Sequence, residues 1–169
     1  MDLTTSYLGL ELPHPFIVGA SPIARSVDGA RRAEDGGAAA IVLHSLFEEQ
    51  FARHEVGLQA HVHSHEETFA EATSYFTASV GYHYGPEQYL EHVAKLKQRL
   101  SIPVIASLNG THEGGWMDYA RYLAEAGADA LELNLYHQPR PTEEPAAAIE
   151  ADLLNIITAA PGTISTKVN

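Results

Sequence analysis

Five short apolar runs in this chain each finish near a small or polar residue whose side chain could take part in chemistry. The runs cover residues 16–18, 39–43, 103–107, 130–134 and 163–167, and the residues at or just after their ends are Ser21, Ser45, Ser107, Asn134 and Lys167. Hydroxyl and amide groups can hold the polar edge of a ligand, and an ammonium group can supply positive charge beside it. We expect these side chains to line one site if the ends of the runs meet.

The stretches between the runs predict the elements that would bring those ends together. Continuous apolar runs are typical of strands buried on both faces of a parallel sheet, and their alternation with helices is typical of β/α units. Helices are predicted at residues 27–35, 86–100, 115–126 and 145–159. The carboxyl ends of the strands form the active site of a β/α barrel, so the polar residues would converge there.

The length of the chain limits how much of such a fold it can form. Its 169 residues stop directly after the fifth strand signal, whereas a closed eight-stranded barrel needs roughly 250. We predict an α/β chain that forms the N-terminal portion, about five strands, of a TIM (β/α)8 barrel, with residues 1–169 in one domain. A complete doubly wound sheet is the competing interpretation, but that fold normally finishes with a helix packed on its last strand.

Two further segments flank the predicted units. Residues 3–12 are β-prone with Gly9 as a turn, which predicts a small hairpin at the floor of the barrel. Residues 46–85 form a long excursion, rich in histidine, glutamate and aromatic residues, that no simple β/α connection requires. Excursions of that size usually act as lids or subunit contacts, so we expect one of these roles, including a possible homodimer interface, and a helical part near residues 66–75.

Composition excludes several classes of function. The formal net charge is −12, and the ten lysine and arginine residues are scattered, which argues against nucleic-acid binding. No stretch approaches the roughly 20 apolar residues of a membrane span, and the start of the chain lacks a signal-peptide pattern, so we predict a cytoplasmic protein without membrane association. The absence of cysteine removes disulfides, thiolate zinc sites and a cysteine nucleophile.

Several motifs, in this order and spacing, resemble the dihydroorotate dehydrogenase family of flavin enzymes, and within it the dihydroorotate dehydrogenase-like branch. They are Leu-Gly-Leu-Glu-Leu at 8–12, Val-Gly-Ala-Ser-Pro at 18–22, Ile-Pro-Val-Ile-Ala-Ser-Leu-Asn-Gly at 102–110, Trp116, and Ala-Gly-Ala-Asp-Ala-Leu-Glu-Leu-Asn-Leu at 126–135. The resemblance implies an FMN-binding β/α barrel that oxidises dihydroorotate, or a related dihydropyrimidine, in pyrimidine biosynthesis. A base would remove a proton from one ring carbon while the adjacent carbon gives hydride to the flavin.

The resemblance also implies a role for individual residues. Ala20 and Ser21 would back the flavin through main-chain contacts, and Ser45 and Ser107 would meet its polar edge. Asn134 would lie beside both flavin and substrate, and Lys167 would stabilise the anionic reduced flavin. The predicted cofactor-binding set is completed by His44 and Asn109.

Three departures from the family pattern bear on the substrate. His44 stands where members often carry lysine, and it is a weaker, pH-dependent cation. The family's Asn-Leu-Ser-Cys-Pro-Asn becomes Asn-Leu-Tyr-His-Gln-Pro at 134–139, so the cysteine base falls on His137 and the second asparagine is lost to Pro139. An asparagine-bearing substrate loop is replaced by Gly-Tyr-His-Tyr-Gly-Pro at 81–86. We predict His137 as the base, alongside Asn134 and Lys167 as catalytic residues, with a packed loop imidazole as the alternative for His137.

Other interpretations follow from the same residues. The departures permit a non-catalytic or differently specific flavin-binding paralogue. His61, His63 and His65 alternate in one segment and could bind zinc or nickel, although a solvated lid is the favoured interpretation and no metal is predicted. The loops that hold the FMN phosphate in the family would follow later strands. The electron acceptor stays open among fumarate, a nicotinamide cofactor reached through a partner subunit, and a quinone.

Overall fold

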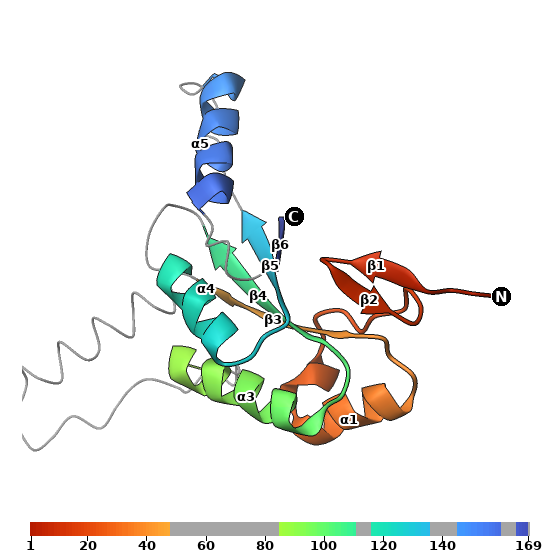
Figure 1. The fold of residues 1–169 in the computed structure, drawn as a ribbon. Coiled ribbons are helices and arrows are strands. Elements are labelled where there is room, and N and C mark those ends of the chain that lie inside the picture. Colours follow the sequence, from red (N-terminus) through yellow and green to blue (C-terminus); the bar gives the residue numbers. More distant parts are fainter. Residues whose placement is uncertain (48–84, 111–115, 136–144, 160–164, 169) are drawn as a thin grey trace, which may run out of the picture.

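A four-stranded parallel sheet, in the order β3-β4-β5-β6, forms the centre of the chain (Figure 1). The computed structural model describes residues 1–47, 85–110, 116–135, 145–159 and 165–168. The elements in chain order are β1 (Thr5–Tyr7), β2 (Leu10–Leu12), the 3-10 helix η1 (Pro22–Arg25), α1 (Val27–Asp35), β3 (Ile41–Phe47), α3 (Pro86–Arg99), β4 (Val104–Gly110), α4 (Trp116–Glu125), β5 (Ala130–Leu135), α5 (Ala146–Ala159) and β6 (Ser165–Val168). The predicted series of parallel β/α units is confirmed over this part of the chain, while closure into a barrel stays a prediction.

The helices begin and end where local signals in the sequence place them. Ser26 caps α1, because its hydroxyl accepts a hydrogen bond from the backbone N–H of Gly29 at 3.0 Å. Gly37 follows the end of that helix with a φ of 88°, in the left-handed region that glycine tolerates. Pro86 opens α3 in its first turn. All four predicted helices are confirmed to within one residue at each end.

The N-terminal hairpin is also confirmed. β1 and β2 pair antiparallel with Tyr7 opposite Leu10, and the two residues between them, Leu8 and Gly9, have φ angles of 55° and 73°. Positive φ at both loop positions is the geometry of a tight two-residue turn, which glycine adopts readily and leucine rarely does. Residues 46 and 47, predicted as the start of the excursion, belong to β3 instead.

The run at residues 16–18, predicted as the first core strand, is a single parallel bridge rather than a strand. Val18 pairs with Ile41; its N–H donates to the oxygen of Ala40 at 3.0 Å, and its oxygen accepts from the N–H of Val42 at 2.8 Å. Prolines at positions 13 and 15 remove backbone donors before the run, and η1 begins at Pro22 soon after it. The segment therefore lies beside β3 as predicted but is too short to form a ladder.

The two faces of the sheet have different neighbours. Residues Leu43, Leu108 and Leu133 belong to the main core with Tyr89 and Leu96 of α3, so helices cover that face. The opposite face carries a smaller apolar cluster at the amino-terminal ends of the strands, where the hairpin packs on them; its buried members are Leu12, Ala39, Ala40, Val42, Ile105 and Ala130. Figure 1 shows α3 and α4 on one side of the strands and the hairpin on the other. The side chains that follow on this second face form the candidate site.

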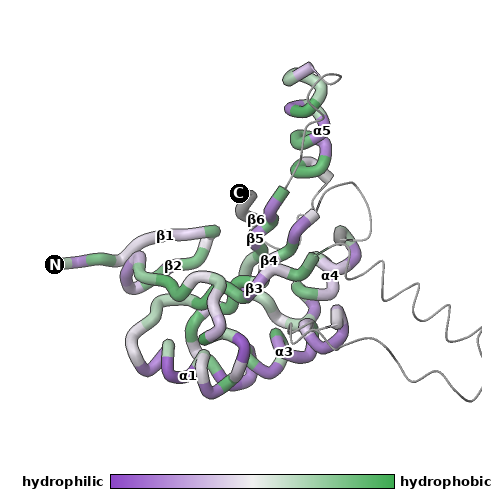
Figure 2. Tube along the Cα trace, turned by 180° about the vertical axis from the view of Figure 1, so that it is seen from behind, coloured by the Kyte–Doolittle hydropathy of each residue, from purple (hydrophilic) through white to green (hydrophobic). Residues whose placement is uncertain are grey.

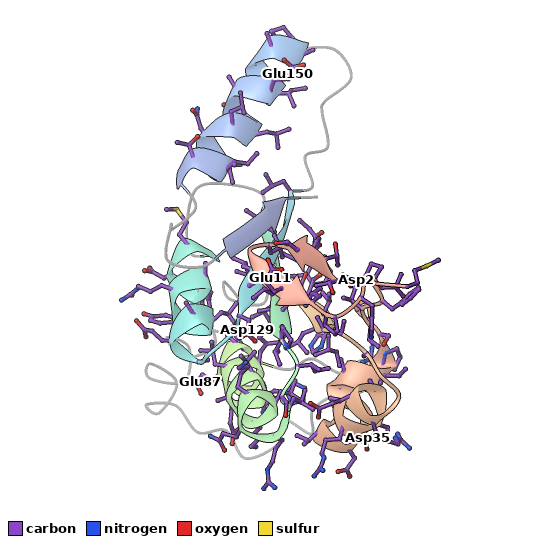
Figure 3. All side chains as sticks on the ribbon, turned by 45° about the vertical axis from the view of Figure 1, so that its right-hand side comes forward. Asp2, Glu11, Asp35, Glu87, Asp129 and Glu150 are labelled. Atoms are coloured by element: carbon purple, nitrogen blue, oxygen red, sulfur yellow. The ribbon has the colours of Figure 1, made fainter. Side chains whose placement is uncertain are left out.

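The helix α5 extends away from the sheet, beyond the carboxyl ends of β4 and β5 (Figure 1). Ile156 is its one buried residue among those whose side chains are described, while Leu154 and Ile157 are exposed. Figure 2 shows hydrophobic and hydrophilic residues interleaved along this helix. Acidic residues are spread over the molecule, from Asp2 and Glu11 to Glu87 and Glu150 (Figure 3). Within the described residues, no helix has the length and apolar character needed to cross a membrane.

Candidate functional site

Two rows of mostly polar residues cross the sheet on the face opposite the helices. The first row is in register across all four strands, with Ser45 opposite Ser107, Ser107 opposite Glu132, and Glu132 opposite Lys167. The second row lies two residues further along, with Phe47 opposite Asn109 and Asn109 opposite Asn134. Side chains two residues apart in a strand point to the same face. Both rows therefore stand beyond the small apolar cluster, toward the carboxyl ends of the strands.

Four of these residues form one hydrogen-bonded group, here called the serine–asparagine cluster: Ser45, Ser107, Glu132 and Asn134. The two serine Oγ atoms are 2.7 Å apart, and Asn134 Nδ2 donates to Ser45 Oγ at 3.2 Å and to Ser107 Oγ at 3.1 Å. Ser107 Oγ donates to Glu132 Oε1 at 3.1 Å. Because a carboxylate only accepts, the Ser107 proton is directed to Glu132, and Ser45 must donate to Ser107. The cluster therefore has one proton order, with the amide nitrogen of Asn134 turned toward the serines.

A bulge in β3 places Ser45 in this cluster. The register moves from Val42 opposite Ile105 to Ser45 opposite Ser107, so β3 uses three residues where β4 uses two. The fully buried Tyr89 of α3 fills the resulting break in the ladder. Its hydroxyl donates to the His44 oxygen at 2.9 Å and accepts from the Ser107 N–H at 3.1 Å. Burial raises the pKa of Tyr89 well above its usual value, so the hydroxyl keeps its proton and can make both bonds.

The bulge also determines the position of His44. Its ring lies edge-on to Tyr89, with 5.1 Å between ring centroids, on the side of the sheet that α3 covers. Burial lowers the pKa of His44 below its ordinary value, and the nearby His92 and Arg25 lower it further. At neutral pH the imidazole is therefore uncharged. The structure does not bring His44 into the serine–asparagine cluster, and its predicted role at the cofactor stays a prediction.

The lowered pKa of His44 gives a testable pH dependence. The unfolded chain binds a proton at the ordinary histidine pKa of about 6.5, whereas the folded chain binds it only at lower pH. The contribution of His44 to the free energy of unfolding is therefore fully present above about pH 6.5, and it is lost as the pH falls from there through the lower pKa of the folded state. The free energy of unfolding, measured by urea denaturation between about pH 7.5 and about pH 5.5, should therefore decrease less in His44→Gln than in the wild type. Equal decreases would contradict this assignment.

The other predicted cofactor residues lie near the cluster or before β3. Asn109 is 5% exposed, and its Oδ1 is buried and accepts no hydrogen bond from the part of the chain that the structure describes. Ser21 stands at the start of η1, and Ala20 precedes it in an exposed turn after Val18. An exposed backbone turn with small side chains allows a flat ligand to approach closely. These positions agree with the expected contacts without testing them.

Several predicted residues lie outside what the structure describes. His137 and the histidines at 61, 63 and 65 fall in such segments, as does nearly all of the 46–85 excursion. Lys167 lies within β6, opposite Glu132 in register, and only its backbone position is described. Among the described residues, no group of three or more histidine, aspartate and glutamate side chains could hold a metal ion.

The sequence predictions omitted two residues that shape the site. Glu132 directs the proton order of the cluster, and its position two residues before Asn134 in a strand was a usable signal that both face the same way. Tyr89 lies on the apolar stripe of α3, where the pattern indicates only a core residue. Its hydrogen bonds across the bulge depend on tertiary structure, so no local signal could have revealed them.

Three known proteins are similar to this chain, and the similarity covers only part of each of them. No protein-family model matches the chain. Two curated proteins, each named NAD-dependent dihydropyrimidine dehydrogenase subunit PreA and found in two strains of Escherichia coli, are 28% identical over 142 residues, which cover 79% of this chain and 32% of each relative. A putative dihydroorotate dehydrogenase A (fumarate) from Aeropyrum pernix is 49% identical over 43 residues, or 25% of this chain and 14% of that protein. The chain thus spans about a third or less of the length of these relatives.

A solved structure described as PhdJ bound to substrate intermediate is similar with a TM-score of 0.48 and 17% identity, covering 91% of this chain and 38% of that chain. A likeness at this level carries no conclusion about fold or function. The curated relatives are all named as dehydrogenases. The sequence likeness is therefore to oxidoreductases of the dihydropyrimidine and dihydroorotate dehydrogenase type.

Proposed function

We propose that this chain belongs to an FMN-dependent dehydrogenase that oxidises dihydroorotate or a related dihydropyrimidine. The observation that carries the proposal is the convergence of Ser45, Ser107, Glu132 and Asn134 on the sheet face opposite the helices, toward the carboxyl ends of the strands. Ligand sites of parallel β/α folds form at those ends. The curated names of the relatives direct the choice of chemistry toward pyrimidine dehydrogenation.

The residues present fit a flavin in three respects. Ala20 is exposed and Ser21 beside it is half-buried, both with small side chains; the serine–asparagine cluster holds Asn134 in one orientation; and Asn109 Oδ1 is a buried acceptor without a partner in the described chain. Such an acceptor fits the polar edge of a heterocycle better than it fits an empty space. Bound FMN would supply the acceptor for a hydride. Lys167 is the proposed source of positive charge beside it, and His137 the proposed base.

Within the cluster, the serines and Glu132 have a different role from Asn134 in this proposal. Ser107 is fully buried, both serine hydroxyls are hydrogen-bonded within the cluster, and their proposed contact with the polar edge of the flavin stays a prediction. Together with Glu132, the two serines fix the rotamer and the amide orientation of Asn134, which then meets the ligand in a preset orientation. Closure of the sheet into a barrel, the cytoplasmic location and a homodimer contact stay predictions.

The test is a visible absorption spectrum of the full-length protein purified without added cofactor, followed by anaerobic titration with dihydroorotate and, separately, with dihydrouracil. Bound flavin bands that bleach with either ring are the expected result. A protein that binds flavin but stays oxidised with both rings would overturn the proposed substrate class. A colourless protein that also fails to take up added FMN would overturn the proposal as a whole.

A further inference from the structure

Asn109 occupies a position at the site that the cluster does not use. It lies near the carboxyl end of β4, opposite Asn134 on β5 and opposite Phe47 on β3. Only 5% of the residue is exposed. Because it stands two residues after Ser107, it is on the same face as the cluster and one step closer to the ends of the strands. Asn109 therefore stands nearer than either serine to the strand ends, where ligands of parallel β/α folds bind.

The side-chain oxygen of Asn109 is a buried acceptor. It receives no hydrogen bond from the described residues, although the neighbouring amide of Asn134 has both of its N–H groups directed to serine oxygens. Burying an acceptor without a partner costs stability, and native structures retain such groups mainly where a water, an ion or a ligand completes them. The cluster cannot complete it, because the Asn134 donors are already committed to Ser45 and Ser107.

The chemistry of the missing partner follows from the groups around it. A carbonyl oxygen only accepts, so the missing partner must present an N–H or O–H group to Asn109 Oδ1. Phe47, in register beside Asn109, provides an aromatic side chain of the kind on which flat rings stack. A flat ring with an N–H at its edge fits both features.

We propose that Asn109 Oδ1 accepts a hydrogen bond from the ring N–H of a cyclic imide, an N–H flanked by two carbonyl groups. The choice of an imide rests on the proposed function, since the flavin's pyrimidine edge and a dihydropyrimidine ring both carry this group. Asn109 is then a residue that selects the ligand rather than one that performs the proton or hydride transfer. In this assignment, Asn109 Oδ1 recognises the ring N–H of the ligand.

The test compares each ligand with its N-methylated form. Dissociation constants are measured by calorimetry for FMN against its N3-methyl analogue, and for uracil against 3-methyluracil, using the wild type and the Asn109→Leu variant. The wild type is expected to bind the N–H form of one pair about tenfold more tightly than the methylated form. Asn109→Leu is expected to lose that preference. Asn155→Leu, at an exposed position on α5, is the matched control and should keep it.

Each arm identifies a different source of the imide. A preference lost only in the flavin pair assigns Asn109 to the cofactor, and one lost only in the uracil pair assigns it to the substrate. If Asn109→Leu preserves every preference of the wild type, or if the wild type has none, the inference is overturned even when flavin binding stands. Failure to bind FMN at all overturns the proposed function, and the uracil pair still decides the role of Asn109.

A stability measurement separates ligand selection from a structural role. Replacing Asn109 by leucine removes a buried oxygen that accepts no hydrogen bond from the described residues, so the melting temperature of the ligand-free Asn109→Leu variant should equal or exceed that of the wild type. A marked decrease would show that Asn109 supports the fold and would contradict the inference. Asn109→Ala repeats the binding comparison with a smaller side chain if the leucine variant does not fold.

Discussion

Replacing Tyr89 by phenylalanine is expected to lower the free energy of unfolding by about 2–4 kcal/mol, although it removes a single oxygen atom. That hydroxyl satisfies the buried N–H of Ser107 and the carbonyl of His44, where the bulge in β3 interrupts the normal ladder. Both backbone groups would lose their partner, and each unsatisfied buried group costs about 1–3 kcal/mol. Urea denaturation followed by circular dichroism measures the change.

Tyr122→Phe is the matched control for this prediction. Tyr122 lies on α4, is 38% exposed and packs edge-on against Tyr119. Losing its hydroxyl should change the free energy of unfolding by less than about 0.5 kcal/mol, as is usual at exposed positions. Because Tyr89 holds Ser45 opposite Ser107, Tyr89→Phe should also weaken flavin binding in the protein that remains folded. Equal stability of the two variants would contradict the role given to the Tyr89 hydroxyl.

Gly29→Ala is the second substitution with a large expected effect. A Cβ atom at this buried position in α1 would overlap the backbone oxygen of Ile23 and stand 3.0 Å from Ser26 Oγ. Backbone cannot move aside as a flexible side chain can, so η1 and α1 would have to separate. We expect a loss of about 3 kcal/mol in the free energy of unfolding, at the upper end of the usual cost of overpacking. Thermal and urea denaturation measure it.

Gly19→Ala provides the comparison, because nothing lies within 4 Å of the Cβ that it would add. Both substitutions change the freedom of the unfolded chain in the same way, so the difference between them reports the folded state alone. Gly19→Ala is expected to be neutral or slightly stabilising. The proposed close packing of η1 on α1 would be wrong if the two variants had the same stability.

Most of the fold could be predicted from the sequence because its signals are local. The limits of α1 follow from Ser26 and the glycines at 36 and 37, and the start of α3 follows from Pro86. The parallel strands follow from apolar runs of the right length, and their order follows from the rule that consecutive β/α units lie side by side. The run at 16–18 was overestimated, because an apolar pattern does not show how many residues can pair before the chain turns away.

The arrangement of the site was less predictable. Ser45, Ser107 and Asn134 were expected to converge, and the structure brings them together in one cluster. The sequence did not show that the two serine hydroxyls would form hydrogen bonds within that cluster. Their contact with a ligand stays a prediction. The extra residue in β3 was hidden, because the sequence from 41 to 47 does not show where the strand changes register. A bulge depends on what packs against it, here Tyr89 from a helix more than forty positions away, as the 45-residue separation of Tyr89 and His44 shows.

The alternation of the strands has a consequence for how this chain can change over evolutionary time. Leu108 and Leu133 face the helices, while their neighbours Ser107, Asn109 and Asn134 face the candidate site. Mutations that alter ligand preference therefore fall on different positions from those that hold the helices to the sheet, and the two sets can drift separately. Tyr89 joins them, since it is packed in the core and bonded to the backbone of Ser107. A change at position 109 therefore leaves the helix-facing side chains in place, whereas a change at Tyr89 affects the core and the candidate site together.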